Sequence, residues 1–217
     1  MKWYWIKTSW LIKKIFPKYT WGFPPMERIV YLTFDDGPTP EITPWVLDQL
    51  QQFDAKATFF CIGDNIKKHP DVFQQIIQNQ HSVGNHTFNH LNGWKTQTDQ
   101  YLKNVMACAK TIEAASQQPS TINSQPLFRP PYGKIKKSQA KELLSSGYQI
   151  IMWDVLSADF DGRVSPEKCL ENVLRNIRPG SIVVFHDSVK AFKNLQYALP
   201  RTLAFLKEQK YQCEGIV

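Results

Sequence analysis

Strand-like and helix-like segments alternate along nearly the whole 217-residue chain. Short runs rich in β-branched and aromatic residues, such as 28–34 and 57–62, are followed by runs with helical apolar spacing, such as 70–79 and 98–115. Repeated strand–helix units predict a parallel sheet covered by helices. Because hydrophobic residues make up 42% of the chain, one sizeable core can be buried, and we expect an α/β fold in one main domain.

The pattern contains about seven strands separated by helices. The expected strands cover residues 28–34, 57–62, 81–84, 126–128, 148–155, 181–186 and 211–217. The expected helices cover residues 44–53 (with Thr43 as a possible N-cap), 70–79, 98–115, 137–146, 166–176 and 200–209. This many units in one domain favours a distorted (β/α) barrel, similar to a TIM barrel, over an open doubly wound sheet.

The N-terminal segment, residues 1–25, is aromatic and basic and precedes a main domain over 26–217. Lysines interrupt its apolar runs, and neither a signal peptide nor a spanning helix is recognisable, so we expect a cytoplasmic protein. Two interpretations of the segment are open. Ser9 caps a short helix that packs its apolar side chains on the main domain, or the segment lies on a membrane surface. We favour packing, through Trp10, Leu11, Ile15 and Phe16.

The net charge of +7 favours a polyanionic partner, such as nucleic acid, an anionic membrane or a cell-wall polymer. Basic residues are scattered outside the N-terminal segment and the stretch 134–137, and no nucleic-acid motif is present, so we expect no nucleic-acid partner. The four cysteines form no CxxC pair, and Cys61 is expected to be a buried free thiol. We expect a monomer.

Polar residues gather where several predicted strands end. Since the loops at the carboxyl ends of barrel strands build active sites, these residues are the candidates for chemistry. In chain order they are Asp35, Asp36, His86, His90, Arg129, Tyr132, Asp159 and His186.

His86 and His90 are four residues apart, which would place both imidazoles on one side of a helical turn, within reach of one cation. A carboxylate from the pair Asp35–Asp36 would complete a two-histidine, one-carboxylate set with open positions for water. Adjacent aspartates at a strand end point in opposite directions, so one could bind metal while the other acts as a base. Alternatively, the histidines are surface or capping residues, and Asp35-Asp36-Gly37-Pro38 serves only as a turn.

Four motifs resemble, in order, those of the polysaccharide deacetylase family, which is the fourth carbohydrate esterase family and includes chitin, chito-oligosaccharide and peptidoglycan deacetylases. The motifs are Thr33-Phe34-Asp35-Asp36-Gly37-Pro38, His86-Thr87-Phe88-Asn89-His90, Arg129-Pro130-Pro131-Tyr132-Gly133 and Phe185-His186-Asp187. The likeness extends from about Val30 to His186, and the family's distorted barrel agrees with the strand count. It makes residues 26–217 the expected catalytic domain of a hydrolase that removes acetyl groups from amino sugars in cell-wall or related glycans.

The resemblance also implies a role for each candidate. Asp36, His86 and His90 would hold a divalent metal, by default Zn²⁺, with Co²⁺ or Ni²⁺ possible. Asp35 would be the general base, paired with Arg129, and His186 the general acid, tuned by Asp159. The backbone N–H of Tyr132 would stabilise the oxyanion, and Tyr132, Trp153 and Val184 would line the acetyl pocket, although Trp153 could equally be a core residue.

Two residues depart from the family pattern. Asp159 is followed by Phe160 where the family often has Trp, and Val184 stands where it often has Leu. Both changes are apolar, so they put the pocket's shape in doubt and leave the chemistry intact. Two other functions are weighed against deacetylation of an N-acetylated glycan: hydrolysis of a non-carbohydrate amide, and sugar binding by an inactive scaffold.

Overall fold

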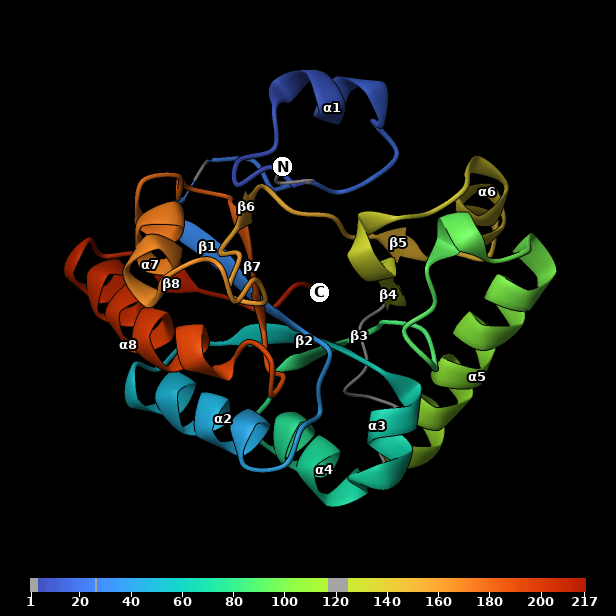
Figure 1. The fold of residues 1–217 in the computed structure, drawn as a ribbon, viewed down its shortest axis with the longest axis horizontal. Coiled ribbons are helices and arrows are strands. Elements are labelled where there is room, and N and C mark those ends of the chain that lie inside the picture. The colour runs from blue at the N-terminus through green and yellow to red at the C-terminus, as the bar shows by residue number, and fades with distance from the viewer. Residues whose placement is uncertain (1–3, 26, 117–124) are drawn as a thin grey trace.

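The computed structural model describes residues 4–25, 27–116 and 125–217, and its centre is a curled sheet of parallel strands (Figure 1). The strands lie in the order β5-β4-β3-β2-β1-β7-β6, and β8 adds a short parallel pairing to β1. Their bounds are β1 Ile29–Asp35, β2 Ala57–Cys61, β3 Ser82–Asn85, β4 Leu127–Phe128, β5 Gln149–Ile150, β6 Val155–Leu156, β7 Ile182–His186 and β8 Gln212–Cys213.

The curl follows from the chain between β5 and β6. These strands are at opposite ends of the sheet order, yet only residues 151–154 separate them in sequence. The two edges must therefore approach each other, since consecutive Cα atoms are only about 3.8 Å apart. This confirms the predicted distorted barrel, and the alternative of an open doubly wound sheet is wrong.

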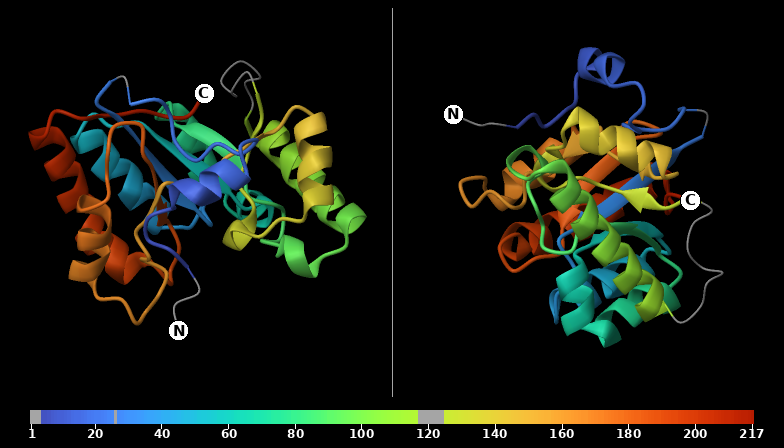
Figure 2. Two further views of the ribbon diagram at one scale, coloured as in Figure 1. Left: turned by 90° about the horizontal axis from the view of Figure 1, so that it is seen from above. Right: turned by 90° about the vertical axis from the view of Figure 1, so that its right-hand side faces the viewer.

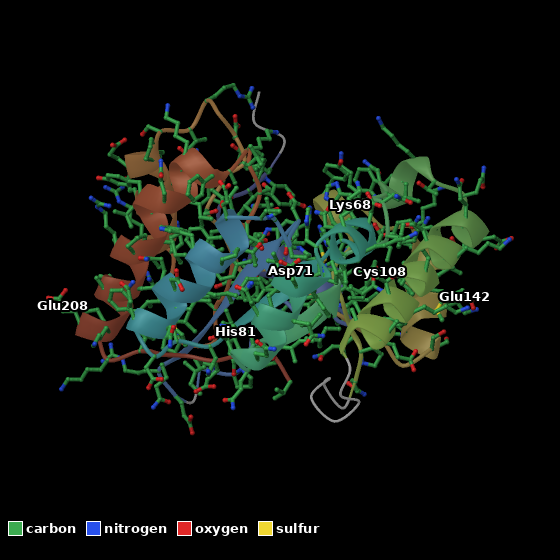
Figure 3. All side chains as sticks on the ribbon, turned by 90° about the horizontal axis from the view of Figure 1, so that it is seen from below. Lys68, Asp71, His81, Cys108, Glu142 and Glu208 are labelled. Atoms are coloured by element: carbon green, nitrogen blue, oxygen red, sulfur yellow. The ribbon has the colours of Figure 1, made fainter. Side chains whose placement is uncertain are left out.

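Helices surround the sheet on its outer side (Figures 1 and 2). Their bounds are α1 Trp10–Ile15, α2 Ile42–Gln52, α3 Gly63–Lys68, α4 Pro70–Gln78, α5 Thr98–Ser116, α6 Lys137–Ser145, α7 Pro166–Leu174 and α8 Phe192–Glu208, with 3₁₀ turns η1 Gly93–Lys95 and η3 Pro131–Gly133. Charged side chains such as Lys68, Glu142 and Glu208 extend from the helices, whereas Cys108 of α5 is fully buried (Figure 3). Cys61 is also buried and free, as predicted.

The core lies between the sheet and these helices. Phe34 of β1 is fully buried and stacks on Phe59 of β2, with ring centroids 5.0 Å apart, and on Phe185 of β7 at 6.1 Å. Strand β2 is buried along its whole length, as expected for a parallel strand covered on both faces.

Three sequence predictions about elements are wrong, and one helix was not predicted. Thr43 is not an N-cap: it lies inside α2, and its hydroxyl donates to the Asp187 carboxylate. Residues 148–155 do not form one strand, because the stretch pairs with β4 at its start and with β7 at its end. Helix α8 begins at Phe192, with Pro200 inside it, and α3 was not foreseen.

The N-terminal segment follows the chain that joins the two edges of the sheet. The Thr8 N–H donates to the Asp154 carbonyl, and the Met152 N–H donates to the Thr20 carbonyl. The ammonium groups of Lys7 and Lys13 both pair with the Asp154 carboxylate, at 2.5 and 2.6 Å. The segment therefore covers backbone groups between β5 and β6 that would otherwise be unpaired edges.

Helix α1 does not pack on the barrel in the way that the sequence predicted. Ser9 caps it as expected, with its side chain accepting from the Ile12 N–H. However, Trp10, Leu11 and Ile15 are 67%, 54% and 56% exposed, so the prediction that these three pack on the barrel is wrong. Phe16 is half-buried and stacks on Tyr19, with ring centroids 5.5 Å apart. The segment is held by its backbone, by Lys7 and Lys13, and by side chains outside α1, such as Ile6 and Trp21, that pack on the core. Trp10, Leu11 and Ile15 of α1 face outward.

We expect Asp154→Ala to lower the free energy of unfolding by about 2–4 kcal/mol. The buried Asp154 carboxylate accepts from Lys7, Lys13 and Ser181. Its removal takes this acceptor from the Lys13 ammonium and the Ser181 hydroxyl, while Lys7 keeps the Asn176 carbonyl. Urea unfolding measures the change. Asp64→Ala is the control, since its ion pair with Lys68 is exposed and should contribute below about 1 kcal/mol. An equal effect for both variants would contradict this account of the segment.

Candidate active site

The loop after β1 places the two aspartates in different surroundings. Asp35 is the last residue of β1, while Asp36 has a left-handed backbone, with φ of 83°. Asn65 Nδ2 donates to the Asp36 carbonyl at 2.7 Å, and the Gly37 N–H donates to Asp187 Oδ1 at 3.0 Å. A Cβ on Gly37 would lie 2.0 Å from Asp187 Oδ2, so only glycine fits this turn.

Asp36, His86 and His90 come together as a candidate metal site. Asp36 Oδ1 lies 3.2 Å from His90 Nε2 and 3.8 Å from His86 Nε2. One ligand atom from each of the three lies within 4.8 Å of the others. Two imidazoles and a carboxylate are a donor set typical of catalytic zinc, and they leave coordination positions open.

The two histidines are not on a helical turn, so that part of the sequence argument is wrong. They follow β3 in a loop in which Thr87 and His90 have φ of 63° and 54°. The spacing of four brings the rings together because the loop reverses, with ring centroids 5.1 Å apart. His86 Nδ1 lies 2.8 Å from the Arg129 carbonyl, which directs Nε2 toward Asp36.

The charges and hydrogen bonds of this cluster fit a cation. Asp36 Oδ1 is buried and makes no hydrogen bond with the described residues. Burial lowers the pKa of His86 to about 4, so this imidazole is neutral and free to bind metal. Burial acts to raise the pKa of Asp36, but His90, His186 and His86 outweigh it and lower that pKa below its usual range. An ionised carboxylate oxygen 3.2 and 3.8 Å from two imidazole nitrogens, one of them on a neutral ring, is what a divalent metal would satisfy.

Asp35 faces a buried arginine. Arg129 Nη1 donates to Asp35 Oδ1 and to the Thr33 hydroxyl, both at 2.7 Å, and the arginine side chain is fully buried. Arg129 also donates to the carbonyls of Ile151 and Met152. The paired guanidinium holds the Asp35 carboxylate in one orientation at the end of β1.

His186 ends β7 and is held by Asp159. Its Nδ1 lies 2.7 Å from Asp159 Oδ1, and its backbone N–H donates to Asp159 Oδ2 at 2.7 Å. Burial acts to lower the pKa of His186, but Asp159, Asp36 and Asp35 outweigh it and raise the pKa to about 9. The imidazole is therefore protonated near neutral pH and can donate a proton.

All five groups, Asp35, Asp36, His86, His90 and His186, line one cavity of about 450 Å³. Tyr132, Trp153 and Val184 also line it. Tyr132 has φ of 61° and contacts His90 edge-on, with ring centroids 4.5 Å apart. Gly133 must remain small, since a Cβ there would lie 2.6 Å from the Trp153 ring.

Two aromatic residues in the cavity were not assigned a role from the sequence. Phe160, noted only as a departure from the family pattern, contacts the His186 ring edge-on at 4.9 Å. Tyr4 in turn contacts Phe160 at 5.3 Å and donates to Asp161 at 2.7 Å. No sequence signal indicates Tyr4, because it precedes β1 and reaches the cavity only through the tertiary path of the N-terminal segment.

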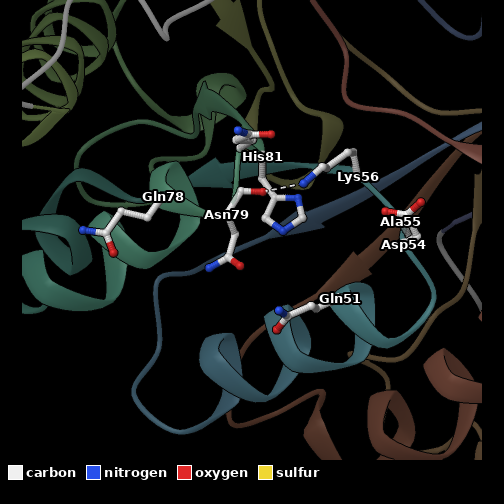
Figure 4. A pocket seen from close by; sticks show the side chains of 8 residues that line it. Gln51, Asp54, Ala55, Lys56, Gln78, Asn79 and His81 are labelled. Atoms are coloured by element: carbon white, nitrogen blue, oxygen red, sulfur yellow. Dashed lines mark hydrogen bonds between the residues drawn. The ribbon is translucent and has the colours of Figure 1, made fainter.

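A second hollow lies before β2 and β3, at the amino ends of the strands (Figure 4). Lys56 Nζ donates to the Asn79 carbonyl at 2.8 Å, and His81 Nδ1 accepts from the Ala57 N–H. Burial, with a further contribution from Lys56, lowers the pKa of His81 to about 4. His81 is thus a neutral structural residue, since the chemistry of such folds lies at the other end of the strands.

Comparison with known proteins agrees with this geometry. Residues 24–151 match the family model described as polysaccharide deacetylase. The chain belongs to the polysaccharide deacetylase family.

Two curated relatives illustrate the family. A peptidoglycan-N-acetylglucosamine deacetylase of Bacillus cereus is 34% identical over 194 residues, covering 89% of this chain and 88% of the relative. A chitooligosaccharide deacetylase of Bradyrhizobium is 34% identical over 160 residues, covering 74% of this chain and 71% of the relative.

Solved structures give the same result. The crystal structure of the Bc1960 peptidoglycan N-acetylglucosamine deacetylase, in complex with 4-naphthalen-1-yl-N-oxidanyl-benzamide, superposes with a TM-score of 0.86 at 30% identity. The match covers 96% of this chain and 95% of that one. The likeness therefore extends over the barrel and most of the N-terminal segment.

We expect His90→Ala to reduce the bound metal by tenfold or more, since it removes one of three protein ligands. Metal content after loading with Zn²⁺ and dialysis, measured by atomic emission, checks this. His69→Ala, outside the cavity, is the control and should retain metal. Full zinc retention by His90→Ala would contradict the proposed ligand set.

Proposed function

We propose that this protein is a metal-dependent hydrolase that removes the acetyl group from an N-acetylglucosamine unit of peptidoglycan, a related oligosaccharide or a glycan precursor. The observation that carries the proposal is that one cavity contains the candidate metal ligands, a paired carboxylate and a protonated imidazole. The curated relatives, with their peptidoglycan and chito-oligosaccharide names, supply the substrate class.

Asp36, His86 and His90 would hold the divalent cation, for which Zn²⁺ is the default and Co²⁺ or Ni²⁺ are alternatives. When bound, the cation would polarise the amide carbonyl and favour deprotonation of a water molecule. No other described group is better placed to hold it, since Asp35 is paired with Arg129.

The remaining residues divide the proton transfers. Asp35 accepts a proton from the attacking water, with Arg129 keeping its carboxylate oriented. His186 donates a proton to the departing amine nitrogen, so that the C–N bond breaks and acetate leaves. The backbone N–H of Tyr132, in its left-handed turn, supports the negative charge that develops on the carbonyl oxygen.

The side walls of the cavity suit an N-acetyl sugar. Trp153, Val184 and Leu156 give apolar surface for the acetyl methyl group, and Tyr4 and Phe160 offer aromatic surface beside His186. An inactive sugar-binding scaffold would not need a base, an acid and three metal ligands in the same cavity.

Acetate release from peptidoglycan fragments, chito-oligomers and nucleotide-linked N-acetylglucosamine tests the proposal. An aryl acetamide in the same panel tests hydrolysis of a non-carbohydrate amide. We expect release from at least one glycan and little from the aryl amide. Acetate release from the aryl amide alone would favour hydrolysis of a non-carbohydrate amide as the function. No acetate release from any substrate by the metal-loaded protein would contradict the proposal.

Substitutions of the two adjacent aspartates should have different effects on turnover and metal content. Asp35→Asn removes the base, so turnover should fall by about 10²–10⁴-fold or more while metal is retained. Asp36→Asn removes ligand charge, so metal content should fall and excess metal should restore part of the activity. Metal analysis beside acetate release measures both, and the reverse pattern would exchange the two roles.

Asp159→Asn should shift the basic limb of the pH–rate profile downward. His186 must be protonated to act as an acid, so the rate falls as pH rises through its pKa of about 9. Because Asp159 raises that pKa, its neutral variant should lower the pKa and lose activity at a lower pH. Asp161→Asn is the control, since Asp161 bonds Tyr4 and Arg163 instead. If the basic limb of the pH–rate profile of Asp159→Asn did not move, His186 would not be the general acid.

A further inference from the structure

Helix α1 exposes its apolar side and turns a lysine toward the barrel, which is the reverse of the usual arrangement in a globular protein. Trp10, Leu11 and Ile15 lie on its outer side and are more than half exposed, while Lys13 turns inward and pairs with Asp154. A helix that serves only to pack would bury its apolar stripe and expose its lysine. Figure 1 shows α1 standing out from the curled sheet, in agreement with the exposure of these three side chains.

The charges around the stripe have one sign. Residues 4–25 contain four lysines and no aspartate or glutamate. Asp154 accepts from Lys7 and Lys13. Lys14 and Lys18 are exposed, and the Lys14 ammonium lies over the Trp10 ring at 4.7 Å. Tryptophan next to lysine is typical of side chains at a membrane–water interface.

The segment is also rigidly attached. Its backbone bonds to Asp154, Ile150 and Met152, and Ser9 caps α1, so the stripe is fixed in place before any partner arrives. A preorganised surface loses little conformational entropy on binding. Trp5, which is 63% exposed, adds a further apolar side chain on the same segment.

From these observations we propose that the outer face of α1, formed by Trp10, Leu11, Lys14, Ile15 and the following Lys18, docks on an anionic phospholipid surface. The apolar side chains enter the interface between headgroups and acyl chains, and the two lysines lie at the anionic headgroups. The proposed contact is peripheral, and no helix among the described residues is long and apolar enough to cross a bilayer.

Sedimentation of the full chain with vesicles tests the proposal. Phosphatidylcholine vesicles with added phosphatidylglycerol should bind the protein at least about tenfold more tightly than pure phosphatidylcholine vesicles, and added salt should weaken the binding. The triple variant Trp10→Ser, Leu11→Ser, Ile15→Ser should reduce binding by at least about tenfold. The double variant Lys14→Glu, Lys18→Glu should do the same on anionic vesicles only.

Matched controls separate this face from general effects. Met106→Ser removes an exposed apolar side chain from α5, and Lys103→Glu with Lys110→Glu makes the same charge change on that helix. Both controls should bind vesicles as the unmodified chain does. The triple variant should keep its melting temperature, since its three side chains are exposed.

Three results of the vesicle assay would overturn the proposal. They are no binding to anionic vesicles, equal binding to neutral and anionic vesicles, and binding that survives the triple variant. Dimerisation that the triple variant abolishes, without vesicle binding, would assign the face to a second copy of the chain and would overturn it too. Analytical ultracentrifugation of both proteins distinguishes that outcome.

Discussion

The structure depends on one buried positive charge, that of the Arg129 guanidinium. The Arg129 guanidinium is fully enclosed, lies over the Phe60 ring at 4.1 Å and bonds to Asp35, Thr33 and two backbone carbonyls. A buried charge is tolerable only when its donors are satisfied, so β1 and the chain after β5 must both approach it in register. The same contact that joins opposite sides of the barrel thus orients the carboxylate proposed as the base.

The left-handed loops position the candidate metal ligands, as Arg129 orients the carboxylate proposed as the base. Asp36, Thr87, His90 and Tyr132 all have positive φ, a backbone region that costs free energy for residues with a Cβ. Such a conformation persists only where surrounding bonds impose it. Asn65 and Asp187 supply them around Asp36. In the loop of the two histidines, the Thr87 N–H donates to Asn85 Oδ1 and the Thr87 hydroxyl accepts from the Leu91 N–H. Asp187 is instructive, since burial raises its pKa to about 8 while it accepts from both Gly37 and Thr43. It braces the loop of Asp36 without lining the cavity.

Sequence reasoning succeeded where a residue's neighbours in the chain decide its structure. Strand ends, helix stripes and the positions of Asp35, His86 and His186 follow from local patterns, and the barrel follows from their repetition. Sequence reasoning failed where a residue that is distant in the chain decides the local structure. Thr43 was expected to cap a helix because nothing nearby indicates Asp187, and 148–155 was expected to be one strand because its change of partner is tertiary. Trp10 was expected to be buried because apolar spacing indicates that a helix has an apolar side. The spacing does not show whether that side faces the barrel or the solvent.

The attachment of the N-terminal segment also has a consequence for biosynthesis. Lys7 leaves the ribosome 147 residues before its partner Asp154. At about 5–20 residues per second, the interval is roughly 7–30 s, during which the tryptophan- and lysine-rich segment has no barrel to join. Any surface that recognises it can therefore meet it as a nascent peptide, before the deacetylase fold exists.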